Sequence, residues 1–175
     1  MATWVVLLRG VNVGGKNKLK MAPLRELLAA AGFAAVRSHL QSGNLVLESE
    51  LDADEVGAGV ADAIEEEHGF RPEVLALSVD ELSEALAANP YAEEDPRRVQ
   101  LFFLAESAAD ADLEPLEALR AKSEAFTLGE GVFYLHAPDG IGRSKLAARA
   151  ERVLGVAATA RNLRTASALL ELVRG

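Results

Sequence analysis

Cysteine is absent from the 175 residues of the sequence. Its absence excludes disulfide bonds, zinc sites built on thiolates and a cysteine nucleophile. The three histidines, His39, His68 and His136, lack the flanking patterns of serine-hydrolase triads, and neither an H-E-x-x-H motif nor an EF-hand loop occurs. We therefore expect no metal, no cofactor and no serine-hydrolase chemistry.

Long hydrophobic runs are also absent. The apolar segment near the N-terminus is too short for the hydrophobic region of a signal peptide, and no later run approaches the ~18 residues of a membrane span. Half of the residues are hydrophobic and 26% are charged, which is the balance of a folded globular domain. These features predict a cytoplasmic globular protein without a membrane partner.

Aromatic residues make up only 5% of the chain. An RNA-recognition sheet needs aromatic side chains on its central strands, but the apolar segments 5–7 and 45–47 are aliphatic. Aromatic residues at 102–103 and 133–134 leave that alternative open for the second half of the chain.

Acidic residues dominate in total but not along the whole chain. The net charge is −9, yet residues 1–47 hold six Lys or Arg against one acid, and residues 48–95 hold one against sixteen. The acidic middle is typical of a solvated helix face, whereas the basic N-terminal part can attract an anion locally. Binding along a duplex depends on neutralising phosphates, so nucleic acid is the less favoured partner.

Hydrophobic periodicity and turn residues predict a similar order of elements twice. The first part comprises strand 3–8, a helix between about 23 and 31, strands 36–41 and 45–48, helix 54–68 and strand 72–79. A short helix at 80–88 and a polar connection follow. The second part comprises strand 99–104, helix 113–122, strands 125–128 and 132–136, helix 144–154 and a final helix at 163–173.

This pattern predicts an α+β fold of two pseudo-repeated, βαββαβ-like (ferredoxin-like) halves. The sheets are expected to be mostly antiparallel and covered by helices, with an extra C-terminal helix. The expected division is a first half at 1–79, a helix and acidic connection at 80–97, and a second half at 98–175.

The segment from Arg9 to Lys20 follows the first predicted strand and is rich in glycine and lysine. Glycines let the backbone approach a ligand closely, and the basic side chains suit a phosphate or carboxylate. Residues 10–16 match G-x-x-x-x-G-K, but a nucleotide-binding P-loop needs Ser or Thr where this chain has Asn17, and a helix that starts at once. Two interpretations remain, an anion site of another kind and an exposed, solvated loop. The candidate ligand-binding residues of this segment are Arg9, Asn12, Gly14, Gly15, Lys16 and Lys18.

Two segments near the C-terminus are further candidates. Ser144 can cap a helix whose N-terminus favours an anion beside Lys145, or it can be a cap and nothing more. Arg161 and Asn162 offer several donors at the start of the last helix. The alternative is that an Asn or Thr only caps this helix and the arginine is solvated. The Q-S-G-N turn that ends at Asn44 is either only a hairpin turn or also the polar rim of a site.

Four separated motifs occur in order along the chain: L-R-G-V-N-V-G-G-K-N-K at 8–18, Q-S-G-N at 41–44, G-R-S-K at 142–145 and T-A-R-N at 159–162. Together they resemble an uncharacterised bacterial family, the domain of unknown function 1697. The resemblance covers nearly the whole chain and implies an α+β fold of two related halves. It implies no known activity.

The sequence favours a protein that binds a phosphorylated small molecule, a nucleotide or a nucleic-acid end. The loop 9–20 would converge with residues 144–145 and 161–162 on this ligand. No nucleophile or general base stands out, so the sequence does not decide whether the protein is an enzyme. The alternative is a protein-interaction or homodimerising domain, and the oligomeric state is left open.

Overall fold

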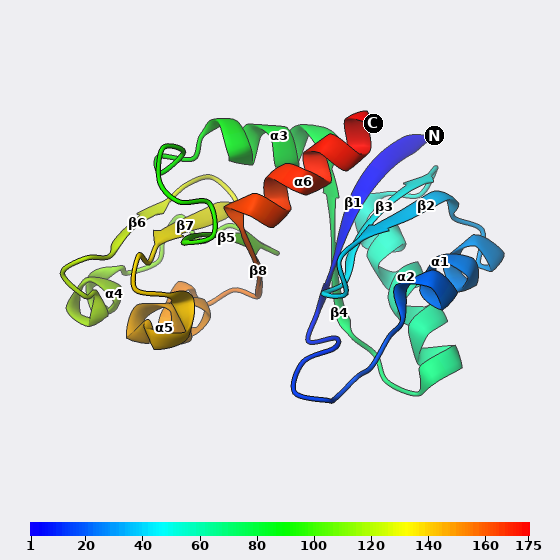
Figure 1. Ribbon diagram of the computed structural model, residues 1–175, viewed down its shortest axis with the longest axis horizontal. Coiled ribbons are helices and arrows are strands. Elements are labelled where there is room, and N and C mark those ends of the chain that lie inside the picture. The colour runs from blue at the N-terminus through cyan, green and yellow to red at the C-terminus, as the bar shows by residue number, and fades with distance from the viewer. The chain divides into compact units, whose positions relative to one another are not determined.

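The computed structural model describes residues 1–175 and contains six α-helices and two four-stranded antiparallel sheets (Figure 1). Contacts group the chain into two compact units. Unit 1 consists of residues 1–84 and 168–175, and unit 2 consists of residues 85–167. None of the helices has both the length and the apolar character that crossing a membrane requires. The predicted α+β class with two related halves is confirmed.

Unit 1 follows the order βαββαβ and continues into a further helix. Its elements are β1 (Ala2–Arg9), α1 (Met21–Ala30), β2 (Ala34–His39), β3 (Asn44–Ser49), α2 (Ala53–His68), β4 (Glu73–Ser78) and α3 (Val79–Ala87). The strand order in the sheet is β2-β3-β1-β4, and α1 and α2 cover one face of it (Figure 1). Because side chains alternate along a strand, Val6, Leu8, Leu45 and Leu47 share that face and form a core with the apolar stripes of the two helices.

Unit 2 repeats this plan. Its elements are β5 (Val99–Leu104), α4 (Glu114–Leu119), β6 (Ala125–Leu128), β7 (Val132–His136), α5 (Lys145–Leu154) and β8 (Ala158–Asn162), followed by α6 (Leu163–Arg174). The strand order is β6-β7-β5-β8. Its core is more aromatic than that of unit 1, since Phe102 and Phe133 meet edge to face with ring centroids 5.6 Å apart.

Equivalent hydrogen bonds mark the internal repeat. The Leu8 amide at the end of β1 donates to Gly43 O over 2.8 Å, and the Leu104 amide at the end of β5 donates to Gly131 O over 2.9 Å. Both glycines precede the strand that pairs with the donor strand, and both have positive φ, +83° and +72°. Helices α2 and α5 likewise both end at a left-handed glycine.

One strand differs from the sequence-based prediction. Residues 159–165 were expected to open the last helix, so the second half was predicted as βαββα before that helix. The structure instead has the five-residue strand β8, which pairs antiparallel with β5. The segment A-T-A-R-N is short, and its alternation of apolar and polar residues depends on two small alanines, which are a weak strand signal. Its extended form depends on hydrogen bonds to β5, which are long-range in sequence.

The boundary between the units lies inside two helices, α3 and α6. The sequence-based division placed the whole of the last helix in the second half. The end of α6 from residue 168, together with Gly175, groups with unit 1, where the Arg37 Nη1 of β2 donates a hydrogen bond to Leu172 O.

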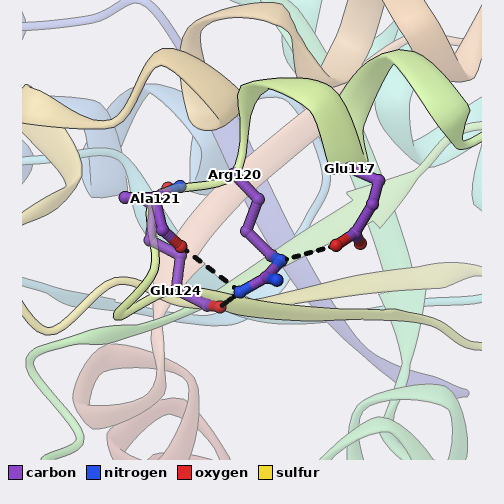
Figure 2. Close-up of polar contacts among 4 residues, drawn as sticks. All are labelled: Glu117, Arg120, Ala121 and Glu124. Atoms are coloured by element: carbon purple, nitrogen blue, oxygen red, sulfur yellow. Dashed lines mark hydrogen bonds and ion pairs between the residues drawn. The ribbon is translucent and has the colours of Figure 1, made fainter.

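The connection from α4 to β6 is held by side chains (Figure 2). Arg120 Nε donates to Glu117 Oε1 over 2.9 Å, and Arg120 Nη1 donates to Glu124 O over 2.8 Å. The buried Glu124 carboxylate accepts from the Ala121 amide over 2.8 Å. A helix of only six residues, Glu114–Leu119, is therefore joined to the sheet by a compact polar turn.

Candidate functional site

The glycine- and lysine-rich loop between β1 and α1 is a small hairpin. The Lys16 amide donates to Val13 O, and the Asn12 amide donates to Asn17 O, each over 3.0 Å. Gly14 and Gly15 occupy the turn with φ of +59° and +76°, as a type I′ turn requires. The glycines therefore have a conformational role, and they place the loop in a defined shape.

Asn12 fixes this hairpin to the body of unit 1. Its side-chain amide nitrogen donates to Leu19 O over 2.8 Å and to Gln41 O over 2.5 Å, and its Oδ1 accepts from the Leu19 amide over 2.8 Å. These bonds use the groups with which Asn12 could hold a ligand. That Asn12 binds a ligand directly stays a prediction, and its contacts show that it positions the loop.

A pocket of about 530 Å³ lies beside the loop and is lined entirely by residues of unit 1. The lining combines the hairpin and the start of α1 with the β2–β3 turn and the last residue of α2. It includes two lysines and one histidine but no aspartate or glutamate, in a chain with 27 acidic residues. The lining residues are Asn12, Gly15, Lys18, Leu19, Lys20, Pro23, Gln41 and His68.

The start of α1 adds to the positive character of this pocket. Lys20 is the N-cap residue of α1, its side chain makes no capping hydrogen bond, and the first turn contains no acid. By contrast, Asp52 caps α2 and Ser144 caps α5 with side-chain oxygens. Uncapped amides and the helix dipole favour negative charge at such an end. Because α1 begins only at Met21, the loop lacks the immediate helix start of a nucleotide P-loop, as predicted.

Other predicted residues of the first half lie outside the pocket lining. Gly14 and Lys16 are exposed on the hairpin. Arg9 Nη1 donates to Glu73 Oε2 over 3.2 Å on the neighbouring strand. Asn44 is fully buried, and its amide donates to His39 O and Ser42 Oγ, so it holds the β2–β3 turn together.

The remaining predicted residues belong to unit 2. Ser144 accepts a hydrogen bond from the Ala147 amide over 3.0 Å and caps α5, with Lys145 exposed beside it. Asn162 Oδ1 accepts from the Thr165 amide over 2.8 Å and caps α6. The convergence of these residues with the loop of unit 1 stays a prediction.

Arg161 lies on β8 opposite Leu101 of β5. It therefore shares with Leu101 the sheet face that does not carry the Phe102–Phe133 core. Its Nη1 donates to Ala160 O over 2.8 Å. Burial lowers the pKa of Arg161 to about 10, which leaves the guanidinium charged at neutral pH.

Five of the lining residues were not among the predicted ligand-binding residues: Leu19, Lys20, Pro23, Gln41 and His68. Gln41 opens the Q-S-G-N turn, so its motif was noted but its side chain was not assigned. Nothing in the sequence around His68 separates it from the other histidines. Its place beside the loop follows from the packing of α2 against the sheet, which no local pattern encodes.

Residues 1–134 match the family described as "Protein of unknown function (DUF1697)". The chain belongs to this family. The match covers the whole of unit 1 except its last eight residues, and it includes the hairpin and every residue that lines the pocket.

One solved structure with a similar fold is that of the conserved bacterial protein SP0830 from Streptococcus pneumoniae. It shares 24% sequence identity with this chain, the alignment covers 98% of both chains, and the TM-score is 0.76. This similarity shows that the two-unit fold occurs in another bacterial protein. No curated protein sequence matches the chain.

Proposed function

We propose that unit 1 binds a phosphate-bearing small molecule in the pocket beside its glycine- and lysine-rich hairpin. The observation that carries this proposal is the charge of the lining, with Lys18 and Lys20 present and no acid among the lining residues. In a chain of net charge −9, such a lining attracts an anion more strongly than the surrounding surface does.

Each lining group has a role in the proposed complex. The two lysine ammonium groups act as point charges that donate hydrogen bonds to phosphate oxygens. Gly15 has no side chain and a positive φ of +76°, so the ligand can approach the backbone closely. The proposal is one of binding and assigns no catalytic role to a lining residue.

Lysine substitutions test this proposal directly. Ribose 5-phosphate and inorganic phosphate would be titrated calorimetrically into the wild type at low salt. Hydrogen bonds to charged groups contribute roughly 1.5–3 kcal/mol, so Lys18→Ala and Lys20→Ala should each raise Kd roughly tenfold to a hundredfold. Added salt should also weaken binding, because the pocket is open to solvent.

Lys16→Ala is the matched control for these variants. Lys16 lies in the same hairpin and is exposed, but it does not line the pocket. Its substitution should change Kd by no more than about twofold. Equal losses from all three lysine variants would indicate a diffuse basic surface, and no binding of either probe would overturn the proposal.

A protein-interaction or homodimerising role is a second proposal, supported by two exposed apolar side chains. Val13 is 64% exposed at the hairpin tip, and Leu40 is 59% exposed beside Gln41, whose carbonyl accepts from Asn12. Sedimentation velocity at rising concentration tests it. Val13→Thr and Leu40→Asn should abolish self-association, and Asn suits the positive φ of position 40. A monomer at every concentration would exclude the homodimer.

We also infer that both units are ferredoxin-like. The support is that the chain order βαββαβ and the sheet order β4-β1-β3-β2 recur as β8-β5-β7-β6.

A further inference from the structure

We propose that the ligand of this pocket is a mononucleotide, in which a phosphate monoester is joined to a flat heteroaromatic ring. This inference rests on the proposed phosphate-binding function and adds the identity of the rest of the ligand. The size of the pocket is the first argument. About 530 Å³ lies within the range of roughly 300–1,000 Å³ that is typical of sites for whole small molecules. An inorganic anion at the lysines would leave most of this space unfilled.

The lining offers flat surfaces as well as charge. The pyrrolidine ring of Pro23 and the imidazole of His68 both line the pocket, and they come from different helices, α1 and α2. A planar ring of the ligand can stack on the imidazole, and the apolar Pro23 ring can cover the adjoining surface. Sugar phosphates without a base have no flat group to use these surfaces.

His68 is positioned for such a contact by the way α2 ends. Gly69 adopts the left-handed conformation, with φ of +78°, and reverses the chain after His68. Phe70 then packs against the core of unit 1, and its ring centroid lies 6.2 Å from that of His68. The imidazole is tilted by 41° to this anchored neighbour and is exposed, so a planar ring of a ligand can reach it.

Gln41 supplies a polar group that can recognise the edge of a base. Its backbone carbonyl is held by Asn12, so the position of the residue is fixed relative to the hairpin. The side-chain amide contains both donors and an acceptor, and Gln41 is one of the residues that line the pocket. Amide side chains commonly recognise nucleobase edges because they can donate and accept at once. The pocket thus combines groups for the phosphate, the ring face and the ring edge.

The test compares four probes of the wild-type full chain by isothermal titration: adenosine 5′-monophosphate, ribose 5-phosphate, inorganic phosphate and adenosine. We expect adenosine 5′-monophosphate to bind about tenfold more tightly than ribose 5-phosphate, because stacking of one base on an aromatic ring contributes roughly fivefold to a hundredfold. Adenosine should bind more weakly than its monophosphate, since it lacks the group that the lysines hold.

Variants of His68 separate stacking from charge. His68→Ala should raise the Kd of adenosine 5′-monophosphate to about that of ribose 5-phosphate and leave the Kd of ribose 5-phosphate unchanged within about twofold. His68→Phe keeps a flat ring and should retain the preference for the nucleotide. Loss of that preference in both variants would overturn the stacking role.

The outcomes distinguish this inference from the function on which it rests. If ribose 5-phosphate and adenosine 5′-monophosphate bind equally, and both depend on Lys18 and Lys20, the anion site stands and the nucleotide inference fails. If adenosine binds as tightly as its monophosphate, or if no probe binds, the proposed phosphate-binding function fails as well.

Discussion

The two units have the same sheet topology but opposite charge in the loop that follows the first strand. In unit 1, residues 10–20 join β1 to α1 and contain three glycines, three lysines and no acid. In unit 2, residues 105–113 join β5 to α4 and contain three acids, no glycine and no basic residue. The comparison indicates that the fold determines where this loop emerges, and that loop composition determines whether an anion can bind there.

The units also end their first helix differently. Helix α1 is followed by Gly32, with φ of +105°, and the Phe33 amide donates to Leu28 O. This is a backbone cap that a glycine makes possible. Helix α4 ends at Arg120, which has extended backbone and binds carbonyl groups with its side chain. Equivalent positions in the repeat are therefore stabilised by different chemistry.

Substitution of the two equivalent turn glycines should give the largest difference between the units. A Cβ at Gly43 would lie 2.7 Å from Leu8 Cβ and 2.8 Å from Val11 Cγ2, whereas a Cβ at Gly131 would meet nothing within 4 Å. Gly43→Ala combines left-handed strain with overpacking and should cost roughly 2–5 kcal/mol. Gly131→Ala should cost only the strain, about 1–2 kcal/mol. Urea unfolding followed by far-UV circular dichroism measures both.

Trp4, the single tryptophan, lies on β1 and gives an independent fluorescence signal for unit 1. The lower stability of Gly43→Ala should also appear when urea unfolding is followed by this fluorescence. Equal losses in the two alanine variants would show that the turn of unit 1 relaxes around the added methyl group.

The side chains of Asn12 and Asn17 test whether the loop of unit 1 is a fixed structure. Both residues have positive φ, so glycine can replace either without added strain. Asn12→Gly removes the three hydrogen bonds to Leu19 and Gln41 and should cost about 1–3 kcal/mol. Asn17→Gly removes one exposed hydrogen bond, to Gly10 O. It should therefore cost less than Asn12→Gly, about 0.5–1 kcal/mol.

Thermal unfolding monitored by Trp4 fluorescence compares the two glycine variants. If Asn12→Gly proves no more destabilising than Asn17→Gly, the hairpin is held by contacts other than those of the Asn12 side chain.

Substitution of Tyr134 should have a small effect on stability at neutral pH and should change the pH dependence of stability. Tyr134 of β7 pairs with Leu101 of β5, and Val46 of β3 pairs with Val5 of β1. Tyr134 and Val46 therefore occupy equivalent positions in the two units. The buried Tyr134 hydroxyl donates to Ala85 O over 2.7 Å. Tyr134→Phe should therefore cost about 1 kcal/mol at pH 7.

Burial raises the pKa of Tyr134 above its ordinary value of 10.0. The folded protein holds this proton more tightly than the unfolded chain, so the contribution to stability is complete below about pH 10 and is lost as the pH rises through the folded pKa. Urea midpoints from about pH 8 to pH 11 should fall less steeply in Tyr134→Phe than in the wild type.

Most elements could be predicted from the sequence because their signals are local. The strands at 99–104, 125–128 and 132–136 were predicted with the observed bounds. Helices α2 and α5 begin directly after their capping residues, Asp52 and Ser144. Strand β8 could not be predicted, since its extended form comes from pairing with β5. For the site, Gly15 and Lys18 were predicted and line the pocket, whereas His68 was missed.

The sequence alone determined that a glycine- and lysine-rich loop would follow the first strand and would not be a nucleotide P-loop. Asn17 and the late helix start are visible in the residues themselves. Only the tertiary structure decided that Asn12 holds this loop and that Lys18, Lys20, Gln41 and His68 surround one pocket. Turn and helix signals depend on neighbouring residues, whereas a pocket depends on side chains that the packing of α2 and the sheet brings together.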